Sequence, residues 1–450
     1  MNDIFGERAT VAIIMEIEAA LARAQAAQGI IPQAAADAIN AKAHPNFAPE
    51  PEIRKNAECV GHQLVALLTT WSVALGDDAA AYLHFGATTP DIRLTTQIIQ
   101  MRRAMERFLA QMLRIEAILM RLCETYRATP MMGRTVGRHA LPITFGLKTS
   151  TWMLENRRNI ERIQGWLRRT NTGVLAGAVG TYAALGNCGF DVEAQTMAEL
   201  GLEAPEPADW KGTRDKHAEW GCLIAITSKS MARFAQDVFL LQGDDFGELD
   251  EGNQEVGSST MPHKSNPRKA TAIIGLSRQI CHESGVLLDW MVSIYERDQI
   301  SNDSSLENIA LHMDKLLCAA EDLLGGLIVN PENMERNLCR TDGLIMAERV
   351  MFALGGSIGK HKAHTLVREA ANQSRDRHVA FKQVLLDSPE ISRHLSDAQI
   401  IELLDHRTYI GLAPQAVDRA LAFIENHRTQ QATFGFFDQT HQPQNTKEKK

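Results

Sequence analysis

Several features that mark common protein classes are missing from this chain of 450 residues. Its seven cysteines are scattered, odd in number and never in a CxxC pair, which argues against a disulfide framework and against a zinc site, so we expect no metal. No apolar run reaches the roughly 18 residues that span a bilayer, and the N-terminus has no signal-peptide pattern. We therefore expect a cytoplasmic protein with no membrane partner.

Positive charge is also scarce. The 47 Lys and Arg residues are outnumbered by 55 Asp and Glu residues, the formal net charge is -8, and no basic stripe is present. Such a chain is a poor candidate for binding nucleic acid, although it can hold a local positive pocket for a dianionic substrate. The length predicts about two or three domains of ~100–200 residues each.

Alternating runs that would make a convincing sheet are absent, and helical periodicity dominates. In the segment 10–28 apolar residues recur at spacings of three and four, and Gly29 then ends the pattern. We expect further long helices over 97–126, 143–167, 222–242, 272–294 and 304–328. Long helices without intervening strands predict an all-α fold built around a helix bundle.

Glycine and proline mark the expected breaks, which fall at 44–51, 85–91, 129–142, 186–212, 243–267 and 355–359. They suggest an N-terminal helical domain over 1–95 and a central bundle over 96–354 with a loop at 252–267. A C-terminal helical domain over 355–428 and a polar tail over 429–450 would follow.

The richest segment is 257–267, a glycine-led loop that carries hydroxyls, one fixed cation and one amide. Removing a proton next to a carboxylate needs a base and a way to hold the doubled charge that results. A hydroxyl becomes such a base when positive charge nearby lowers its pKa, and lysine, asparagine and backbone N–H groups stabilise oxyanions. A surface turn that caps a helix is the alternative interpretation of this segment.

The segment looks like the catalytic loop of the fumarase/aspartase superfamily, GSSxMPxKxNP. The resemblance implies that Ser258 is the general base and that Lys264 and Asn266 hold a substrate carboxylate. It also implies three all-helical domains with a central five-helix bundle, a 20-helix core in a homotetramer, and active sites shared between subunits.

Four further segments carry the likeness through about 3–427. Segment 84–92 resembles HxGxTSxD, which implies that Thr88 and Thr89 bind a carboxylate and that His84 lines the site, although the threonines alone could equally cap a helix. Segment 133–148 resembles GRTHGxHAxPxTFGxK of adenylosuccinate lyases, segment 61–66 resembles HDVxA, and segment 296–301 matches as well. From these segments the resemblance adds His139 and His62 as catalytic candidates and Arg138 and Arg297 as substrate-binding ones.

The departures from the family concern its acid–base pair. The catalytic histidine of GRTH is Val136 here, and the glutamate that pairs with it falls at Thr271. Valine cannot transfer protons, so both members of the pair are missing together. His62, His84 and His139 remain as proton donors, although an unplaced histidine is more often structural.

The residues that handle nucleotides differ too. The N-terminus lacks an early Arg-Tyr, and Asn308 stands where adenylosuccinate lyases have an arginine that grips the AMP phosphate. Loss of a bidentate phosphate clamp is not conservative, so AMP-linked substrates are not expected. The N-terminus and the loop resemble 3-carboxy-cis,cis-muconate cycloisomerases instead, although those enzymes carry tryptophan at the position of Val136.

These resemblances lead to three hypotheses. The first is a lyase that eliminates an amine or an oxygen group from a substituted succinate, with no cofactor, and the second is a cycloisomerase that forms a lactone from a muconate. The third is a catalytically inactive structural tetramer, which the complete set of Ser258, Lys264 and Asn266 argues against. The expected partners are a di- or tricarboxylate substrate and identical subunits.

Overall fold

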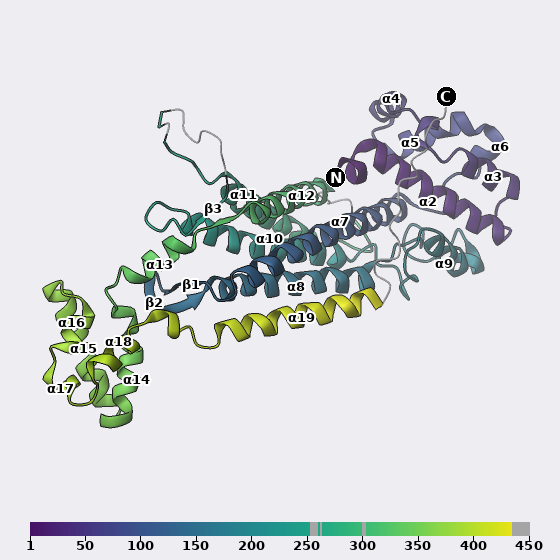
Figure 1. Ribbon diagram of the computed structural model, residues 1–450. Coiled ribbons are helices and arrows are strands. Elements are labelled where there is room, and N and C mark those ends of the chain that lie inside the picture. Colours follow the sequence, from purple (N-terminus) through teal and green to yellow (C-terminus); the bar gives the residue numbers. More distant parts are fainter. Residues whose placement is uncertain (253–259, 262, 299–302, 434–450) are drawn as a thin grey trace, which may run out of the picture. The chain divides into compact units, whose positions relative to one another are not determined.

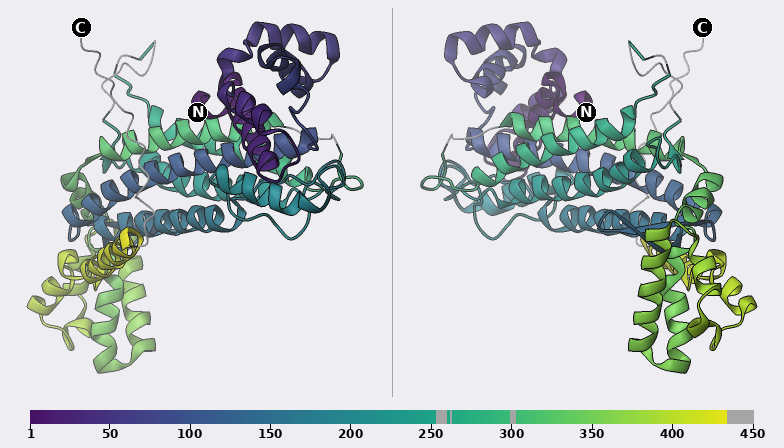
Figure 2. Two further views of the ribbon diagram at one scale, coloured as in Figure 1. Left: turned by 90° about the vertical axis from the view of Figure 1, so that its right-hand side faces the viewer. Right: turned by 90° about the vertical axis from the view of Figure 1, so that its left-hand side faces the viewer.

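The computed structural model describes residues 1–252, 260, 261, 263–298 and 303–433. Its longest elements are helices α7 (Thr89–Thr125), α8 (Phe145–Thr170), α10 (Asp215–Leu241), α11 (Arg268–Asp289) and α12 (Asp303–Gly325). They run lengthwise beside one another in Figure 1 and in both views of Figure 2. The predicted all-α fold is confirmed, and each long helix overlaps the range expected from its periodicity.

The chain divides into two compact units, and all five cuts between them fall within the five long helices. Unit 1 contains Met1–Leu113, Arg158–Arg233 and Thr271–Ala320, and unit 2 contains Arg114–Arg157, Phe234–Ala270 and Glu321–Lys450. The predicted division into consecutive domains stays a prediction.

Unit 1 adds the N-terminal helices to its share of the long ones. Helix α2 (Glu7–Ala27) buries Ile13 and Ile17 and packs against α3 (Gln33–Ala41) and α9 (Gly189–Glu199). The remaining elements are α1 (Asn2–Phe5), η1 (Pro45–Phe47), α4 (Glu50–Val60), α5 (Gln63–Leu75), α6 (Asp77–Ala80) and η2 (Gly186–Cys188).

Unit 2 contains a feature that the sequence reading missed, the antiparallel hairpin of β1 (Pro130–Thr135) and β2 (Arg138–Thr144). Pro130 pairs with Thr144 and Thr135 with Arg138, across a register shift between Met132 and Arg134. Pro130 and Gly133 interrupt β1 and Pro142 interrupts β2, so the sequence predicts a break here rather than a sheet. A second short pair joins β3 (Leu249–Asp250) to β4 (Ile328–Val329).

The rest of unit 2 is helical. Its elements are α13 (Pro331–Cys339), η3 (Leu344–Met346), α14 (Ala347–Ile358), α15 (Lys360–Arg377), α16 (Phe381–Leu386), α17 (Pro389–Ser392), α18 (Asp397–Leu403), η4 (His406–Thr408) and α19 (Ala413–Thr433). Helices α14 to α18 enclose a hydrophobic core of their own that includes Leu354 and Phe381. The polar tail was expected from residue 429, but helix α19 continues to Thr433. Residues 434–450 lie outside the described residues.

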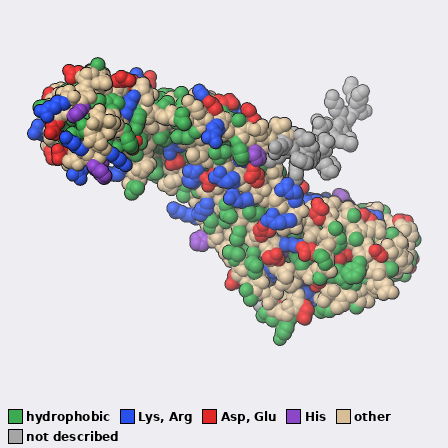
Figure 3. Space-filling view, turned by 90° about the horizontal axis from the view of Figure 1, so that it is seen from below, with side chains coloured by type: hydrophobic (Ala, Val, Ile, Leu, Met, Phe, Trp, Pro, Cys, Tyr) green, Lys and Arg blue, Asp and Glu red, His purple; other side chains and the backbone are tan. Residues whose placement is uncertain are grey.

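In the part of the chain that the structure describes, no helix has the length and apolar character that crossing a bilayer requires. On the face in Figure 3, basic and acidic side chains are interspersed with hydrophobic ones.

Candidate active site

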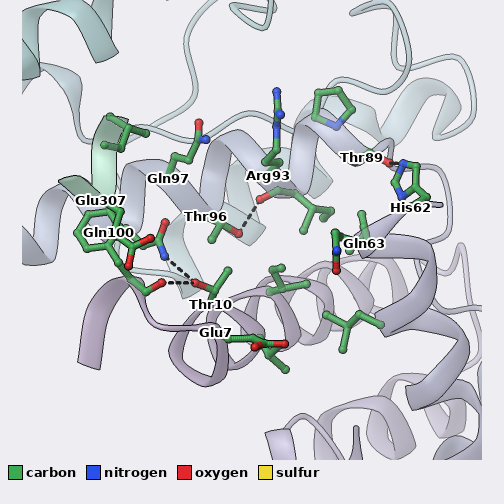
Figure 4. A pocket seen from close by; sticks show the side chains of 18 of the residues that line it. Glu7, Thr10, His62, Gln63, Thr89, Arg93, Thr96, Gln97, Gln100 and Glu307 are labelled. Carbon is green, nitrogen blue, oxygen red and sulfur yellow. Dashed lines mark hydrogen bonds between the residues drawn. The ribbon is translucent and has the colours of Figure 1, made fainter. Parts of the chain in front are cut away.

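Unit 1 contains a cavity of about 940 Å³ between the N-terminal helices, α7, residues 297 and 298, and the start of α12. Four residues expected at the site line it, namely His62, Thr88, Thr89 and Arg297. These positions are separated by up to 235 residues along the chain. In Figure 4, His62 and Thr89 face each other at one end of the cavity, and the polar side chains of α7 continue toward the other end.

His62 is held by the helix that it starts. It is the N-cap of α5, and its Nδ1 accepts a hydrogen bond from the backbone N–H of Val65 at 3.3 Å. Because Nδ1 is an acceptor, neutral His62 carries its proton on Nε2, which lies 3.5 Å from Oγ1 of Thr89. The capping bond therefore turns an N–H group of His62 toward the cavity.

Asp91 fixes the backbone around Thr88 and Thr89. Its buried carboxylate accepts hydrogen bonds from the N–H groups of Thr88, Ala176 and Gly177 at 3.0–3.2 Å. The ammonium of Lys211, also buried, lies 2.9 Å from the same carboxylate. The carboxylate of Asp91 thus ties the threonine turn to the distant segment at 176–177. The local sequence does not indicate this connection.

Arg297 is anchored by the neighbouring part of that segment. Its Nε donates a hydrogen bond to the carbonyl of Ala178 at 3.0 Å. One edge of the guanidinium is thus committed to the backbone, which positions the side chain at the cavity wall. The sequence match at 296–301 had singled out this arginine without indicating its partner.

His84, which was expected to line the site, is absent from the residues that line the cavity. Its Nδ1 lies 2.7 Å from the buried carboxylate of Glu18, and its backbone has a positive φ of 62°. Burial opposes the charged ring, but the hydrogen bond and charge of Glu18, with that of Asp91, raise the pKa of His84. The geometry gives His84 a structural partner, and its role in substrate binding stays a prediction.

The other predicted residues belong to unit 2. Arg138 and His139 are exposed on β2, and burial together with the charges of Arg134, Arg340 and Arg138 lowers the pKa of His139. The neutral imidazole is therefore favoured at neutral pH. Lys264 is exposed and Asn266 half-buried, whereas Ser258 lies outside the described residues.

Val136 occupies the tip of the β1–β2 hairpin. It is 99% exposed and has a φ of 51°, and Gly137 beside it has a φ of 71°. A two-residue hairpin turn with positive φ at both positions normally takes Asn-Gly, because a β-branched side chain is strained there. Strain of this kind, at a position where the family has a catalytic group, is typical of functional sites.

Sequence reasoning missed Arg93, Gln97 and Gln100, which line the cavity on α7. The expected helix began at 97, so the spacing of four from Thr89 to Arg93 to Gln97 was not recognised. Since α7 begins at Thr89, that spacing places all three side chains on one face of the helix.

Among the described residues one group has the chemistry of a metal site, formed by Glu335, Cys339 and His406. Glu335 is already engaged there, since its two oxygens contact His406 at 3.0 Å and Arg407 at 2.7 Å. The group forms an ion-pair cluster in unit 2 and contains none of the residues expected at the site.

Known proteins resemble this chain along most of its length. A family model described as "Lyase" matches residues 1–281, and one described as "Adenylosuccinate lyase C-terminus" matches residues 343–420. The adenylosuccinate lyase of Methanocaldococcus jannaschii is 33% identical over 95% of this chain and 94% of its own. The N-acetyl-S-(2-succino)cysteine lyase of Dickeya dadantii is 31% identical over 94% of each chain.

A solved structure gives the same result for the fold. The 3-carboxy-cis,cis-muconate lactonizing enzyme from Pseudomonas putida superposes with a TM-score of 0.87 at 29% identity, over 94% of this chain and 96% of that one. The relatives thus share a fold and differ in the reactions for which they are named.

Proposed function

The chain belongs to the fumarase/aspartase superfamily of lyases, and we propose that it eliminates a substituent from a 2-substituted succinate to give fumarate or an analogue. The observation that carries the proposal is the pairing of His62 and Thr89 at one end of the cavity. An imidazole N–H and a hydroxyl that meet there form an anion-binding corner, as a carboxylate substrate requires.

In the proposed reaction, Ser258 takes the proton from Cβ as an alkoxide. The electron pair of that C–H bond forms the double bond to Cα, and the substituent leaves Cα with the pair of its own bond. Lys264 and Asn266 hold the carboxylate on which negative charge accumulates, and Thr88 and Thr89 hold the other carboxylate. Ser258 then passes that proton to water, which restores its alkoxide, and the leaving group either takes up a proton or departs as an anion, so no cofactor is consumed.

The leaving group must depart without the family's usual acid, because Val136 stands in its place. An amine or an oxygen group must take up a proton as it leaves, from His139, His62 or water. A thiolate needs no protonation, because a thiol has a pKa near 8.5 and leaves readily as an anion. The relative named for N-acetyl-S-(2-succino)cysteine makes a thioether substrate a specific candidate.

An ultraviolet assay of fumarate formation tests the reaction. We expect fumarate from an N-substituted aspartate or an S-substituted succinate and none from adenylosuccinate, since Asn308 replaces the arginine of the phosphate clamp. Release of fumarate from adenylosuccinate alone would contradict the exclusion of AMP-linked substrates.

The base is tested by Ser258→Ala. Turnover should fall by about a hundred-fold or more, the typical contribution of a positioned base, while gel filtration still shows a homotetramer. Full activity in this variant would mean that another group is the base. Loss of the assembly would instead point to a structural role for the loop.

A cycloisomerase is the second candidate, favoured by the likeness to the muconate lactonizing enzyme and by Val136. Addition of a substrate carboxylate to a double bond releases no leaving group, so that reaction does not need an acid at this position. Loss of the absorbance of 3-carboxy-cis,cis-muconate, with no fumarate from any succinate, would select this reaction and exclude the elimination.

A further inference from the structure

We propose that the cavity contains a second subsite, formed by Gln97 and Arg93, that binds a hydrogen-bond acceptor on the leaving group. The subsite rests on the proposed function, because it assigns the Thr89 end of the cavity to the succinate part of the substrate. It adds the chemical class of the part that departs.

The position of Gln97 sets the reach of this subsite. Thr89, Arg93 and Gln97 follow one another at intervals of one turn on the cavity face of α7. Eight residues of helix rise by about 12 Å, so Gln97 lies well beyond the carboxylate that Thr89 would hold. Figure 4 shows Arg93 between the two, and Gln97 toward the far end.

The side-chain oxygen of Gln97 is engaged in a hydrogen bond, whereas its N–H₂ group is available to a ligand. Its Oε1 lies 3.0 Å from Nε2 of His217, and no described residue accepts a hydrogen bond from its Nε2. Gln100 lines the same cavity but is different, because its Nε2 already donates to the carbonyl of Ile4 and to the hydroxyl of Thr10, both at 3.0 Å. The unused donors of Gln97 are therefore the ones presented to a ligand.

His217 determines which end of the Gln97 amide points into the cavity. It is completely buried, and its Nδ1 has no hydrogen-bond partner among the residues that the structure describes. Burial, together with the positive charges of Arg214, Arg93 and Lys216, lowers the pKa of His217 to about 3, so the ring is neutral. Because Nδ1 meets no acceptor among the described residues, we place the proton on Nε2, which donates it to Oε1 of Gln97.

The charges around the subsite limit what it accepts. Arg93 adds a cation one turn from Gln97, whereas the carboxylate of Glu307 also lines the cavity and that of Glu7 is paired with Arg54. A phosphate, with nearly two negative charges, would meet the carboxylate of Glu307. A single carboxylate or an amide carbonyl suits two amide N–H groups and one guanidinium. The subsite therefore fits a leaving group that is itself an amino-acid or acylamino-acid type of molecule.

Two substrates that differ only in the acceptor test this subsite. N-(carboxymethyl)aspartate carries a carboxylate on its leaving group, and N-ethylaspartate does not. Gln97→Glu keeps an acceptor for His217 but turns a carboxylate toward the cavity. It should lower kcat/KM for the first substrate by about 10- to 100-fold, as expected for a hydrogen bond to a charged group, and change the second by less than about three-fold. Equal losses on both substrates would overturn the subsite.

Variants of His217 test its role as a positioning residue. His217→Leu removes the donor that orients Gln97, and should reproduce the selective loss on N-(carboxymethyl)aspartate. His217→Gln restores an N–H donor, and should recover the preference between the two substrates. An unchanged preference in His217→Leu would show that His217 does not orient the amide.

Failure of the subsite can be separated from failure of the proposed reaction. If the wild-type protein releases fumarate from both substrates equally, the reaction stands and the subsite is wrong. If it releases none from either, calorimetric binding of the same two compounds to the wild type and to Gln97→Glu decides the subsite alone. Tighter binding of the carboxylate compound, lost in the variant, supports it, and equal binding overturns it.

Discussion

His62 lies 3.5 Å from Thr89 through its Nε2 while its Nδ1 caps helix α5. One imidazole therefore begins a helix and presents an N–H group to the cavity. The two roles can be separated by substitution, because asparagine is a good N-cap but has no imidazole.

His62→Asn and His62→Ala should differ in stability and agree in activity. Removing the cap in the alanine variant should lower the free energy of unfolding by about 1 kcal/mol, whereas the asparagine variant should keep it. Both should lose about a hundred-fold or more in kcat if His62 is the proton donor. Urea unfolding and the fumarate assay measure the two effects, and full activity in His62→Asn would remove His62 from the catalytic residues.

Asp91 should matter more for stability than its neighbour in the same ion pair, Asp209. In Asp91→Asn an amide N–H₂ group would face backbone donors, and Lys211 would lose its fully buried counter-charge. Breaking a buried pair in this way costs about 3–5 kcal/mol. Asp209 is partly exposed and lies 2.8 Å from Lys211, so Asp209→Asn should cost clearly less.

The same comparison has a functional readout. Because Asp91 holds the backbone of Thr88, Asp91→Asn should also raise KM in whatever active protein remains. Equal unfolding midpoints for Asp91→Asn and Asp209→Asn would contradict the central place given to Asp91.

The fold followed from the sequence because the long helices repeat their apolar positions over many turns. For helix α7, however, the apolar periodicity predicted the wrong start. Pro90 was taken as part of a break, yet proline is favoured in the first turn of a helix, and α7 begins at Thr89. Starting the helix eight residues late concealed the polar face that Arg93 and Gln97 contribute to the cavity.

The residues of the candidate site were predicted from their resemblance to family motifs. The contacts that hold those residues in place could not be predicted in this way. The partner of Gln97 is His217, 120 residues away, and the partner of Asp91 is Lys211. No local periodicity encodes pairs at such separations. The hairpin carrying Val136 was hidden for another reason, since a strained valine at its tip replaces the usual Asn-Gly signal.

His217 should make the protein lose stability in mild acid. Its folded-state pKa of about 3 lies below the ordinary value of 6.5, so between these pH values the unfolded chain binds the extra proton. The contribution of His217 is complete above about pH 6.5 and is lost as the pH falls toward 3.

Each pH unit in this window is worth up to about 1.4 kcal/mol, so lowering the pH from 7 to 5 should cost the wild type roughly 2 kcal/mol through this residue. The His217→Gln variant should not show this part of the decrease in the free energy of unfolding. Urea unfolding at both pH values measures it, and parallel losses in the two proteins would contradict a neutral, buried His217.

Substitution of Val136 tests whether the strained backbone at the hairpin tip contributes to activity. Val136→Asn places a residue that tolerates positive φ at a position with a φ of 51°, and should raise the free energy of unfolding by about 1 kcal/mol. Val179 offers a matched control, because it is also exposed but is not among the residues with positive φ, so Val179→Asn should leave stability nearly unchanged. If Val136→Asn is more stable but turns over its substrate more slowly, the valine is retained for the reaction rather than for the fold. If stability and activity both rise, the strain serves neither, and replacement of the family's histidine by Val136 would carry no information about the leaving group.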